Sequence, residues 1–325
     1  MATPEGVRNR TAFWPAAEPR ISEGRLEDAR PDRHKWTRDQ LEKGYDPFER
    51  RSLPNALAKV VDDKSALRFA RVYGLPDYAS FVRAEEQQER AHGSDERRRE
   101  LSRLALRWRA RDPLEWVFAQ ARSVRFALEL LEALPHGGRA TASVLRKYRR
   151  PDIDTDTDTR AWPVSVAPVY GTASEIAFSD IDMRPWRFAV AMGPVIRPEF
   201  EVRTIIFNDD RTTREVDSPI DRAQHLVAEL VNGNTENIRW QIHADNDGRL
   251  RFWHYPAGLV EVVWWHVQAV AVAGDAKKIA LCELPSCGAP FIRTDGRQRF
   301  CPADFASKKS RCAALYQKRK SRGTL

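Results

Sequence analysis

The segment CELPSCGAPFIRTDGRQRFC, residues 282–301, and the segment PADFASKKSRCAALYQKRKSR that follows it at 302–322 carry most of the information in this 325-residue chain. They hold every cysteine of the chain, namely Cys282, Cys287, Cys301 and Cys312. From residue 282 onward there are ten Lys and Arg residues and three acids, so this end carries +7 of the chain's net charge of +8. Four cysteines gathered in one short stretch are typical of a metal site rather than of a disulfide scaffold. We therefore expect a small cationic module that is organised by a metal.

The donor atoms and their spacing favour zinc. Zinc prefers four thiolate or imidazole ligands in a tetrahedron, and its structural sites are usually built from close pairs of ligands. Cys282 and Cys287 form one such pair, with four residues between them. Gly288 allows the backbone to fold back so that its amides face the thiolate, and Phe291 and Phe300 can pack beside the metal. The sequence thus predicts a structural Zn²⁺ held by all four cysteines.

The fourth ligand is the point at which alternatives stay open. Cys312 lies eleven residues beyond Cys301. On a helix predicted from about Asp304 to Lys320, Cys312 shares a face with Phe305 and Tyr316 and would point toward the packed side. Two other interpretations are therefore open: a site of three cysteines that water completes, and a module that has lost its metal.

These residues resemble the CGNR zinc finger, in which two cysteines and a glycine precede a phenylalanine, a basic turn and a third cysteine. The matching residues are Cys282, Cys287, Gly288, Phe291, Arg297, Arg299, Phe300 and Cys301. Where the family carries its Cys-Gly-Asn-Arg signature, this chain has Ala306-Ser307-Lys308-Lys309. The preceding region resembles, more loosely, the end of the ABATE-type domain of bacterial stress-induced transcription regulators. The resemblance implies a DNA-binding regulator whose upstream domain senses a ligand or mediates assembly, which leaves a homo-oligomer open.

The basic side chains of the module form the candidate nucleic-acid interface. The predicted contact residues are Arg293, Arg297, Arg299, Lys308, Lys309, Arg311, Lys318, Arg319, Lys320 and Arg322. A basic patch on a zinc-supported helix is typical of nucleic-acid binding, and we expect DNA as the partner. Terminal Lys and Arg runs also bind acidic proteins, so a zinc-stabilised protein-interaction module without DNA binding is the alternative. Because Arg and Lys contact both phosphates and base edges, the sequence predicts no base specificity.

The chain as a whole predicts an α+β fold with four regions. Residues 1–50 indicate a charged arm that contains prolines, and residues 51–150 indicate a helical region. Residues 160–281 indicate an α+β domain with two hairpins and an apolar helix. Residues 282–325 indicate the CGNR-like zinc finger with its basic C-terminal helix.

Local signals place the individual elements. Apolar periodicity and turn residues predict helices over 54–74, 116–134 and 257–274 and hairpins over 201–216 and 238–253. Asp112 is the expected N-terminal cap of the second of these helices, and Gly74 is the expected stop of the first. His266 is expected in the core, and the alternating acids of residues 152–158 are expected in a solvated loop.

The sequence also argues against several functions. It has no run of about 18 apolar residues that could span a bilayer and no signal-peptide core, so a cytoplasmic protein without membrane association is expected. It has no nucleophile elbow, phosphate-binding loop or dinucleotide fingerprint, and we expect no enzyme. A zinc-dependent hydrolase ranks last because four thiolates leave no coordination position for water.

Overall fold

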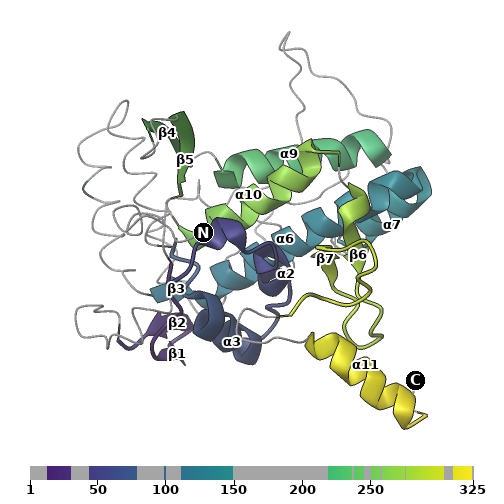
Figure 1. Cartoon of the computed structure of the whole chain (residues 1–325), viewed down its shortest axis with the longest axis horizontal. Coiled ribbons are helices and arrows are strands. Elements are labelled where there is room, and N and C mark those ends of the chain that lie inside the picture. The colour runs from purple at the N-terminus through teal and green to yellow at the C-terminus, as the bar shows by residue number, and fades with distance from the viewer. Residues whose placement is uncertain are drawn as a thin grey trace, which may run out of the picture.

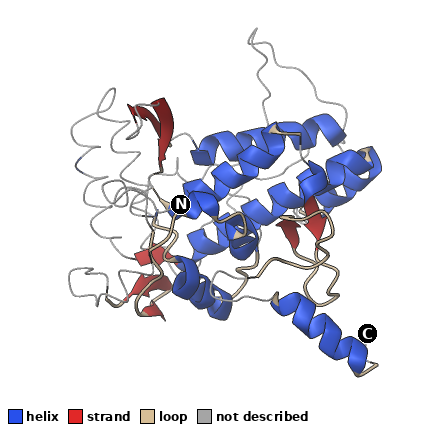
Figure 2. Cartoon of the chain, viewed as in Figure 1, coloured by secondary structure: helices blue, strands red, loops and turns tan. Residues whose placement is uncertain are grey.

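The computed structural model describes residues 13–30, 44–78, 99, 111–148, 219–235, 238–244, 250–256, 258–274, 276–303 and 310–323. It confirms the α+β class, because helices make up most of the described chain and its sheets are small and antiparallel (Figures 1 and 2). The α-helices are α2 (Leu53–Ala58), α3 (Asp63–Tyr73), α6 (Leu114–Ala133), α7 (Gly138–Lys147), α9 (Pro219–Thr235), α10 (Leu259–Val272) and α11 (Arg311–Ser321). The short 3₁₀ turns are η2 (Pro47–Glu49), η3 (Leu134–His136) and η7 (Ala276–Lys278). The strands are β1 (Pro19–Ser22), β2 (Arg25–Asp28), β3 (Arg111–Pro113), β4 (Arg239–Ala244), β5 (Leu250–Tyr255), β6 (Ile279–Leu281) and β7 (Pro290–Ile292).

Helix α6 is the centre of the main core. Its 20 residues contain neither Gly nor Pro, and most of its apolar side chains are buried, among them Trp116 and Phe126. Helices α2, α7, α9 and α10 pack against it (Figure 1). One cluster of buried side chains runs from Leu26 to Ile292, so the helical region and the described part of the predicted α+β domain share a single core. The prediction of a long helix here is confirmed.

A polar bridge crosses this core between three helices. The Trp264 indole on α10 donates to Gln120 Oε1 on α6 over 3.0 Å. The Gln120 amide in turn donates to Asn234 Oδ1 on α9 over 3.2 Å. Buried polar groups are costly unless they are hydrogen-bonded, so this chain of partners favours one arrangement of the three helices. His266 is buried, as predicted, with its Nε2 3.0 Å from the Pro47 carbonyl oxygen.

Asp112 does not cap helix α6, and this prediction is wrong. The residue lies in strand β3, and helix α6 begins two residues later with Pro113 at the N-cap position. The buried Asp112 carboxyl group instead accepts hydrogen bonds from the backbone N–H groups of Tyr78, at 2.6 Å, and Asp77, at 3.2 Å. It therefore holds the backbone of residues 77 and 78, at the end of the 44–78 segment.

The segment 54–74 forms two helices rather than the single helix that its apolar spacing predicts. Asp62 has an extended backbone and accepts from the Ser65 N–H, while the Ser65 hydroxyl accepts from the Asp62 N–H. This capping box starts a new helix, α3, after α2 has ended. Gly74 ends α3 as predicted, with a φ of 99°.

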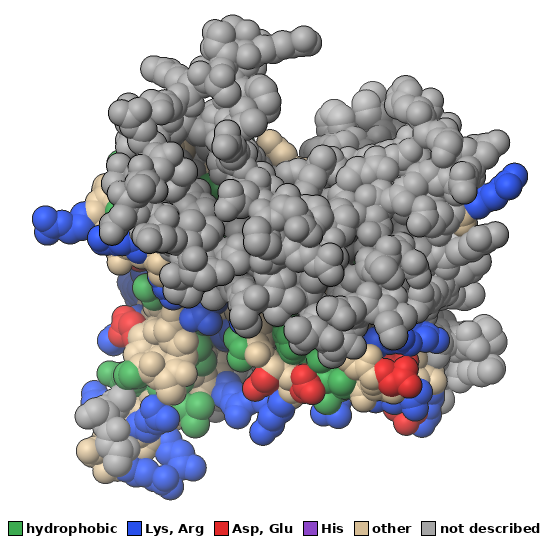
Figure 3. Space-filling view, turned by 180° about the vertical axis from the view of Figure 1, so that it is seen from behind, with side chains coloured by type: hydrophobic (Ala, Val, Ile, Leu, Met, Phe, Trp, Pro, Cys, Tyr) green, Lys and Arg blue, Asp and Glu red, His purple; other side chains and the backbone are tan. Residues whose placement is uncertain are grey.

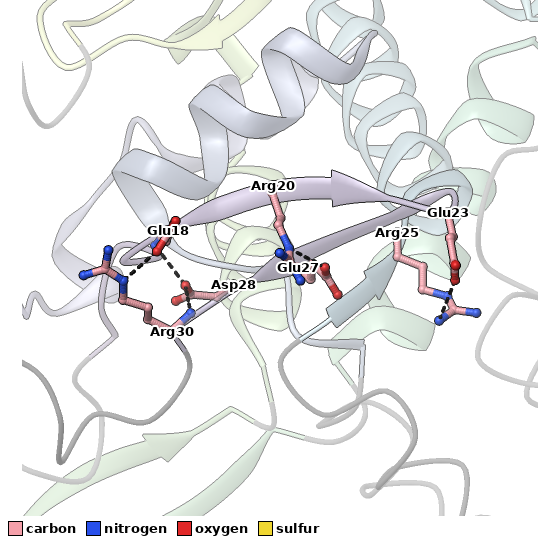
Figure 4. A network of polar contacts seen from close by, with 7 residues as sticks. All are labelled: Glu18, Arg20, Glu23, Arg25, Glu27, Asp28 and Arg30. Carbon is pink, nitrogen blue, oxygen red and sulfur yellow. Dashed lines mark hydrogen bonds and ion pairs between the residues drawn. The ribbon is translucent and has the colours of Figure 1, made fainter.

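Part of the predicted N-terminal arm belongs to the folded body. Strands β1 and β2 form a hairpin, and β2 pairs with β3. Its two-residue turn has positive φ at Glu23 and Gly24, which matches the twist of a tight hairpin. Figure 4 shows ion pairs along the hairpin, including Arg20 to Glu27 across the strands at 2.7 Å. Such exposed pairs each stabilise little, so backbone pairing and the burial of Leu26 hold the hairpin in place.

The C-terminal half follows the predicted order where the structure describes it. The hairpin predicted over 238–253 is confirmed as β4 and β5, and the apolar helix predicted over 257–274 is confirmed as α10. The hairpin predicted over 201–216 and the acidic loop predicted at 152–158 lie outside the described residues. None of the described helices has the length and apolar character needed to cross a membrane.

Candidate metal centre

The short hairpin of β6 and β7 connects the main core to the cysteines. Side chains on a strand alternate between its two faces. Ile279 pairs with Ile292, and both belong to the main core. Ala280 pairs with Phe291, and both belong to a second, smaller core that also contains Cys282. One face of the hairpin therefore packs into the main core and the other face packs into the second core.

The four cysteines come together beside this hairpin. Their sulfur atoms all lie within 4.8 Å of one another, and the Sγ atoms of Cys287 and Cys301 are 3.7 Å apart. Zinc–thiolate bonds of 2.3 Å in a tetrahedron place sulfur atoms about 3.8 Å apart. Cys282 and Cys301 are buried, whereas Cys287 and Cys312 are half-buried. This donor set fits a thiophilic metal ion such as zinc, and the four cysteines could bind one.

The first two cysteines lie on a compact turn. The Cys287 N–H donates to the Leu284 carbonyl over 2.8 Å, and the Gly288 N–H donates to the same oxygen over 3.2 Å. Gly288 has a φ of 52°, so it takes the left-handed conformation that the sequence assigned to a glycine after the second cysteine. The Ala289 backbone also hydrogen-bonds to the Cys287 sulfur. The predicted fold-back of amides toward the thiolate is therefore present.

Cys312 reaches the other three cysteines because helix α11 begins later than predicted. Ser310 has an extended backbone, with φ −61° and ψ 121°, so no continuous helix runs from 304 to 320. Its hydroxyl donates to the Cys301 carbonyl over 2.6 Å and accepts from the Ala313 N–H over 3.2 Å. Cys312 thus lies on the first turn of α11, directly after a cap that is tied to the third cysteine. The alternative of a site formed by only three cysteines is therefore not supported by the geometry, because all four sulfur atoms converge.

The arrangement favours metal binding electrostatically. The first turn of a helix carries partial positive charge, which stabilises a thiolate there. Hydrogen bonds among the sulfurs shift the pKa values of the thiols in opposite directions. A bond with Cys282 lowers the pKa of Cys287, whereas bonds with Cys282 and Cys287 raise the pKa of Cys301. Four thiols this close cannot all ionise without a cation between them. A divalent metal would supply that cation.

The predicted nucleic-acid residues fall into three groups. Arg299 is exposed but already paired within the module, because its Nε donates to both carboxylate oxygens of Glu283 at 2.8 Å and it also interacts with Tyr316. Arg293 donates to the Gly296 carbonyl at 3.5 Å within its own loop. The other exposed residues are Arg297, Arg311, Lys318, Lys320 and Arg322, and Arg319 is half-buried. Lys308 and Lys309 lie outside the described residues.

Helix α11 carries the basic cluster away from the body. Cys312 and Tyr316 pack against the second core, and the rings of Tyr316 and Phe300 lie 4.9 Å apart. Beyond Tyr316 the helix projects outward, and Lys and Arg side chains gather at that end of the molecule (Figures 1 and 3). Within the described chain, Arg311, Lys318, Lys320 and Arg322 form no ion pair. Acidic side chains of the described chain therefore do not offset these four charges.

Two features of the centre were not predicted from the sequence. Ser310 is a typical helix cap, and its type and place before Arg311 could have indicated the true helix start. The pairing of Glu283 with Arg299 joins two loops and has no signal in the spacing of the sequence.

Comparison with known proteins adds no relative. No protein-family model matches the chain, and no curated protein or solved structure does so either. The resemblance to the CGNR finger therefore remains a prediction, and what the structure adds is the convergence of the four cysteines beneath a cationic helix.

Proposed function

We propose that the C-terminal module is a structural zinc site that presents helix α11 to nucleic acid, with duplex DNA as the partner, in a transcription regulator. The observation that carries the proposal is the joint position of Cys312 and Tyr316 on α11. Both residues pack against the cysteine cluster, while Lys318, Lys320 and Arg322 beyond them are exposed. A metal on the four sulfurs would fix the first turn of the helix, and the rigid helix would then hold its cations in a constant arrangement.

The residues that would hold the metal are the four cysteines, and the metal would supply charge neutralisation and a cross-link between two loops and a helix. The exposed cations of α11 would contact phosphates. Every phosphate contact releases condensed counterions, so the affinity should fall steeply as the salt concentration rises.

A salt titration with matched charge variants tests the proposal. Fluorescence anisotropy of a labelled mixed-sequence duplex is measured over a series of KCl concentrations. The variant Lys318→Gln/Lys320→Gln/Arg322→Gln removes three exposed charges from the end of α11. If all three contact phosphate, the slope of log affinity against log salt should become shallower by about 2.7, because each contact contributes about 0.9.

The matched control removes three exposed charges from another helix. Lys64, Arg68 and Arg71 are exposed on α3, and their replacement by Gln should leave the slope unchanged. Equal slopes for both triple variants would show that net charge rather than α11 governs binding, and would overturn the proposal. Tighter binding to duplex RNA than to DNA of the same sequence would reject DNA as the partner.

A further inference from the structure

Two of the four cysteines are brought together by contacts of the protein itself. The Sγ atoms of Cys287 and Cys301 lie 3.7 Å apart. The segments that carry them are joined, because the Glu283 N–H donates to the Arg299 carbonyl over 3.1 Å and the two side chains form an ion pair. The turn around Cys287 also connects strands β6 and β7, one face of which packs into the main core. These contacts need no metal, so Cys287 and Cys301 should stay close together in an empty site.

Cys312 reaches the cluster from a separate element, helix α11. The Ser310 hydroxyl at the start of this helix donates to the Cys301 carbonyl over 2.6 Å. One turn beyond Cys312, the rings of Tyr316 and Phe300 lie 4.9 Å apart, and the helix then projects away from the body (Figure 1). A metal that joins the Cys312 sulfur to the other three would add a link between this helix and the hairpin. The direction of α11 should therefore depend on whether the site is occupied.

The first pair has the features of a redox-sensitive dithiol. Cys287 is half-buried, which leaves it open to a small oxidant, whereas Cys301 beside it is buried. Redox-sensing cysteines are typically accessible and lie next to a second cysteine that resolves the sulfenic acid of the first. A disulfide bond of about 2.05 Å would require the two sulfurs to approach by about 1.7 Å. Every cysteine of the chain belongs to this cluster, so thiol oxidation within the chain is confined to it.

We infer that Cys287 and Cys301 form a peroxide-dependent disulfide that empties the metal site and frees helix α11 from it. The inference rests on the proposed zinc site and names its regulation. The Cys287 thiolate attacks one oxygen of hydrogen peroxide, the O–O bond breaks, and a sulfenic acid and a hydroxide ion form. The Cys301 thiolate then attacks the sulfenic sulfur, the S–O bond breaks, and a disulfide and a second hydroxide ion form. Two electrons pass from the sulfurs to the peroxide, and two protons from the solvent convert both hydroxide ions to water.

Disulfide formation removes two of the four ligands. The thiolates of Cys282 and Cys312 that remain are too few for a structural zinc site, which is built from four ligands, so Zn²⁺ should dissociate. Helix α11 then loses its link through Cys312, and its exposed cations lose their fixed arrangement. The affinity for DNA should therefore fall on oxidation.

Peroxide treatment of the zinc-loaded full-length chain tests the inference. Released zinc is measured with a chromophoric chelator, the remaining thiols are alkylated, and disulfides are mapped by mass spectrometry of peptides. We expect one Zn²⁺ to be released for every two thiols lost, with a disulfide between Cys287 and Cys301. Trypsin should cleave after Lys318 and Lys320 faster in the oxidised protein, because α11 is freed. The anisotropy of a labelled DNA duplex should fall on oxidation and recover after reduction with dithiothreitol and return of zinc.

Two matched variants separate this pair from a general reactivity of the cluster. Cys287→Ser and Cys312→Ser each remove one half-buried cysteine and leave three thiols. In the metal-free form, Cys312→Ser should form the disulfide between Cys287 and Cys301 as fast as the wild type does. Cys287→Ser should lose its thiols several-fold more slowly.

Zinc retention under excess peroxide, a disulfide between other cysteines, unchanged cleavage of α11 or equal rates for the two variants would overturn the inference. A wild-type protein that binds no zinc would overturn the proposed zinc site as well. Zinc release through the expected disulfide, with faster cleavage of α11 but no DNA binding in either state, would support the inference and overturn the proposed role in DNA binding.

Discussion

The buried carboxyl group of Asp112 should make the stability of the fold fall as pH rises. Asp112 is almost fully buried, and burial raises the pKa of its carboxyl group to about 8, against the opposing effect of the N–H groups of Tyr78 and Asp77. In the unfolded chain the same carboxyl ionises near its usual value of 3.8. Between these two pH values the folded protein therefore holds one proton that the unfolded protein has released. The stabilisation is complete below the unfolded pKa and is lost as pH rises through the folded pKa.

The size of the effect follows from this proton difference. One extra proton on the folded state lowers the free energy of unfolding by about 1.4 kcal/mol for each pH unit. From pH 4 to pH 7 this amounts to about 4 kcal/mol, which is a large share of the 5–15 kcal/mol typical of a folded domain. Asp112→Asn removes the titrating group and keeps an oxygen that can accept from the Tyr78 N–H. In the wild type this N–H lies 2.6 Å from Asp112 Oδ1.

Urea unfolding from pH 4 to pH 8 measures this difference, with Asp63→Asn as the control because Asp63 is exposed in the first turn of α3. The wild type and the control should lose stability with pH relative to Asp112→Asn, by about 4 kcal/mol between pH 4 and pH 7. Other titrating groups contribute equally to all three proteins and cancel in the comparison. Parallel curves for the wild type and Asp112→Asn would refute the reasoning.

Two further predictions concern the cysteine module. Cys312→Ser should remove one thiolate from the site, so the cobalt–thiolate absorption per metal should fall by roughly a quarter and zinc should bind more weakly; unchanged absorption would show that Cys312 is not a ligand. Phe291→Ala should destabilise the protein by about 3–5 kcal/mol in urea unfolding, because Phe291 is fully buried behind the cysteines. Leu315→Ala on the exposed side of α11 should cost far less, and equal losses for the two variants would contradict the described packing.

Signals that act over a few residues were readable from the sequence. The helix at 114–133, the hairpin of β4 and β5 and the stop at Gly74 depend on local periodicity and turn chemistry. The same holds for the turn around Cys287, because its hydrogen bonds join residues that are at most four positions apart. The nature of the donors and the concentration of positive charge were also evident from composition.

Contacts between distant parts of the chain were decided only in three dimensions. The hairpin at residues 19–28 joined the body because β2 found its partner in β3, more than 80 positions away. Asp112 became a buried acceptor for the N–H groups of residues 77 and 78 rather than a helix cap, a contact between residues 34 and 35 positions apart.

At the metal centre the same division holds. The sequence determined that four thiols and a basic tail lie near each other along the chain. It did not determine that Cys312 would complete the cluster, because this depends on the Ser310 cap that begins α11 at Arg311. Local backbone preferences and donor chemistry are written in neighbouring residues, whereas side-chain contacts across the fold depend on how whole elements pack.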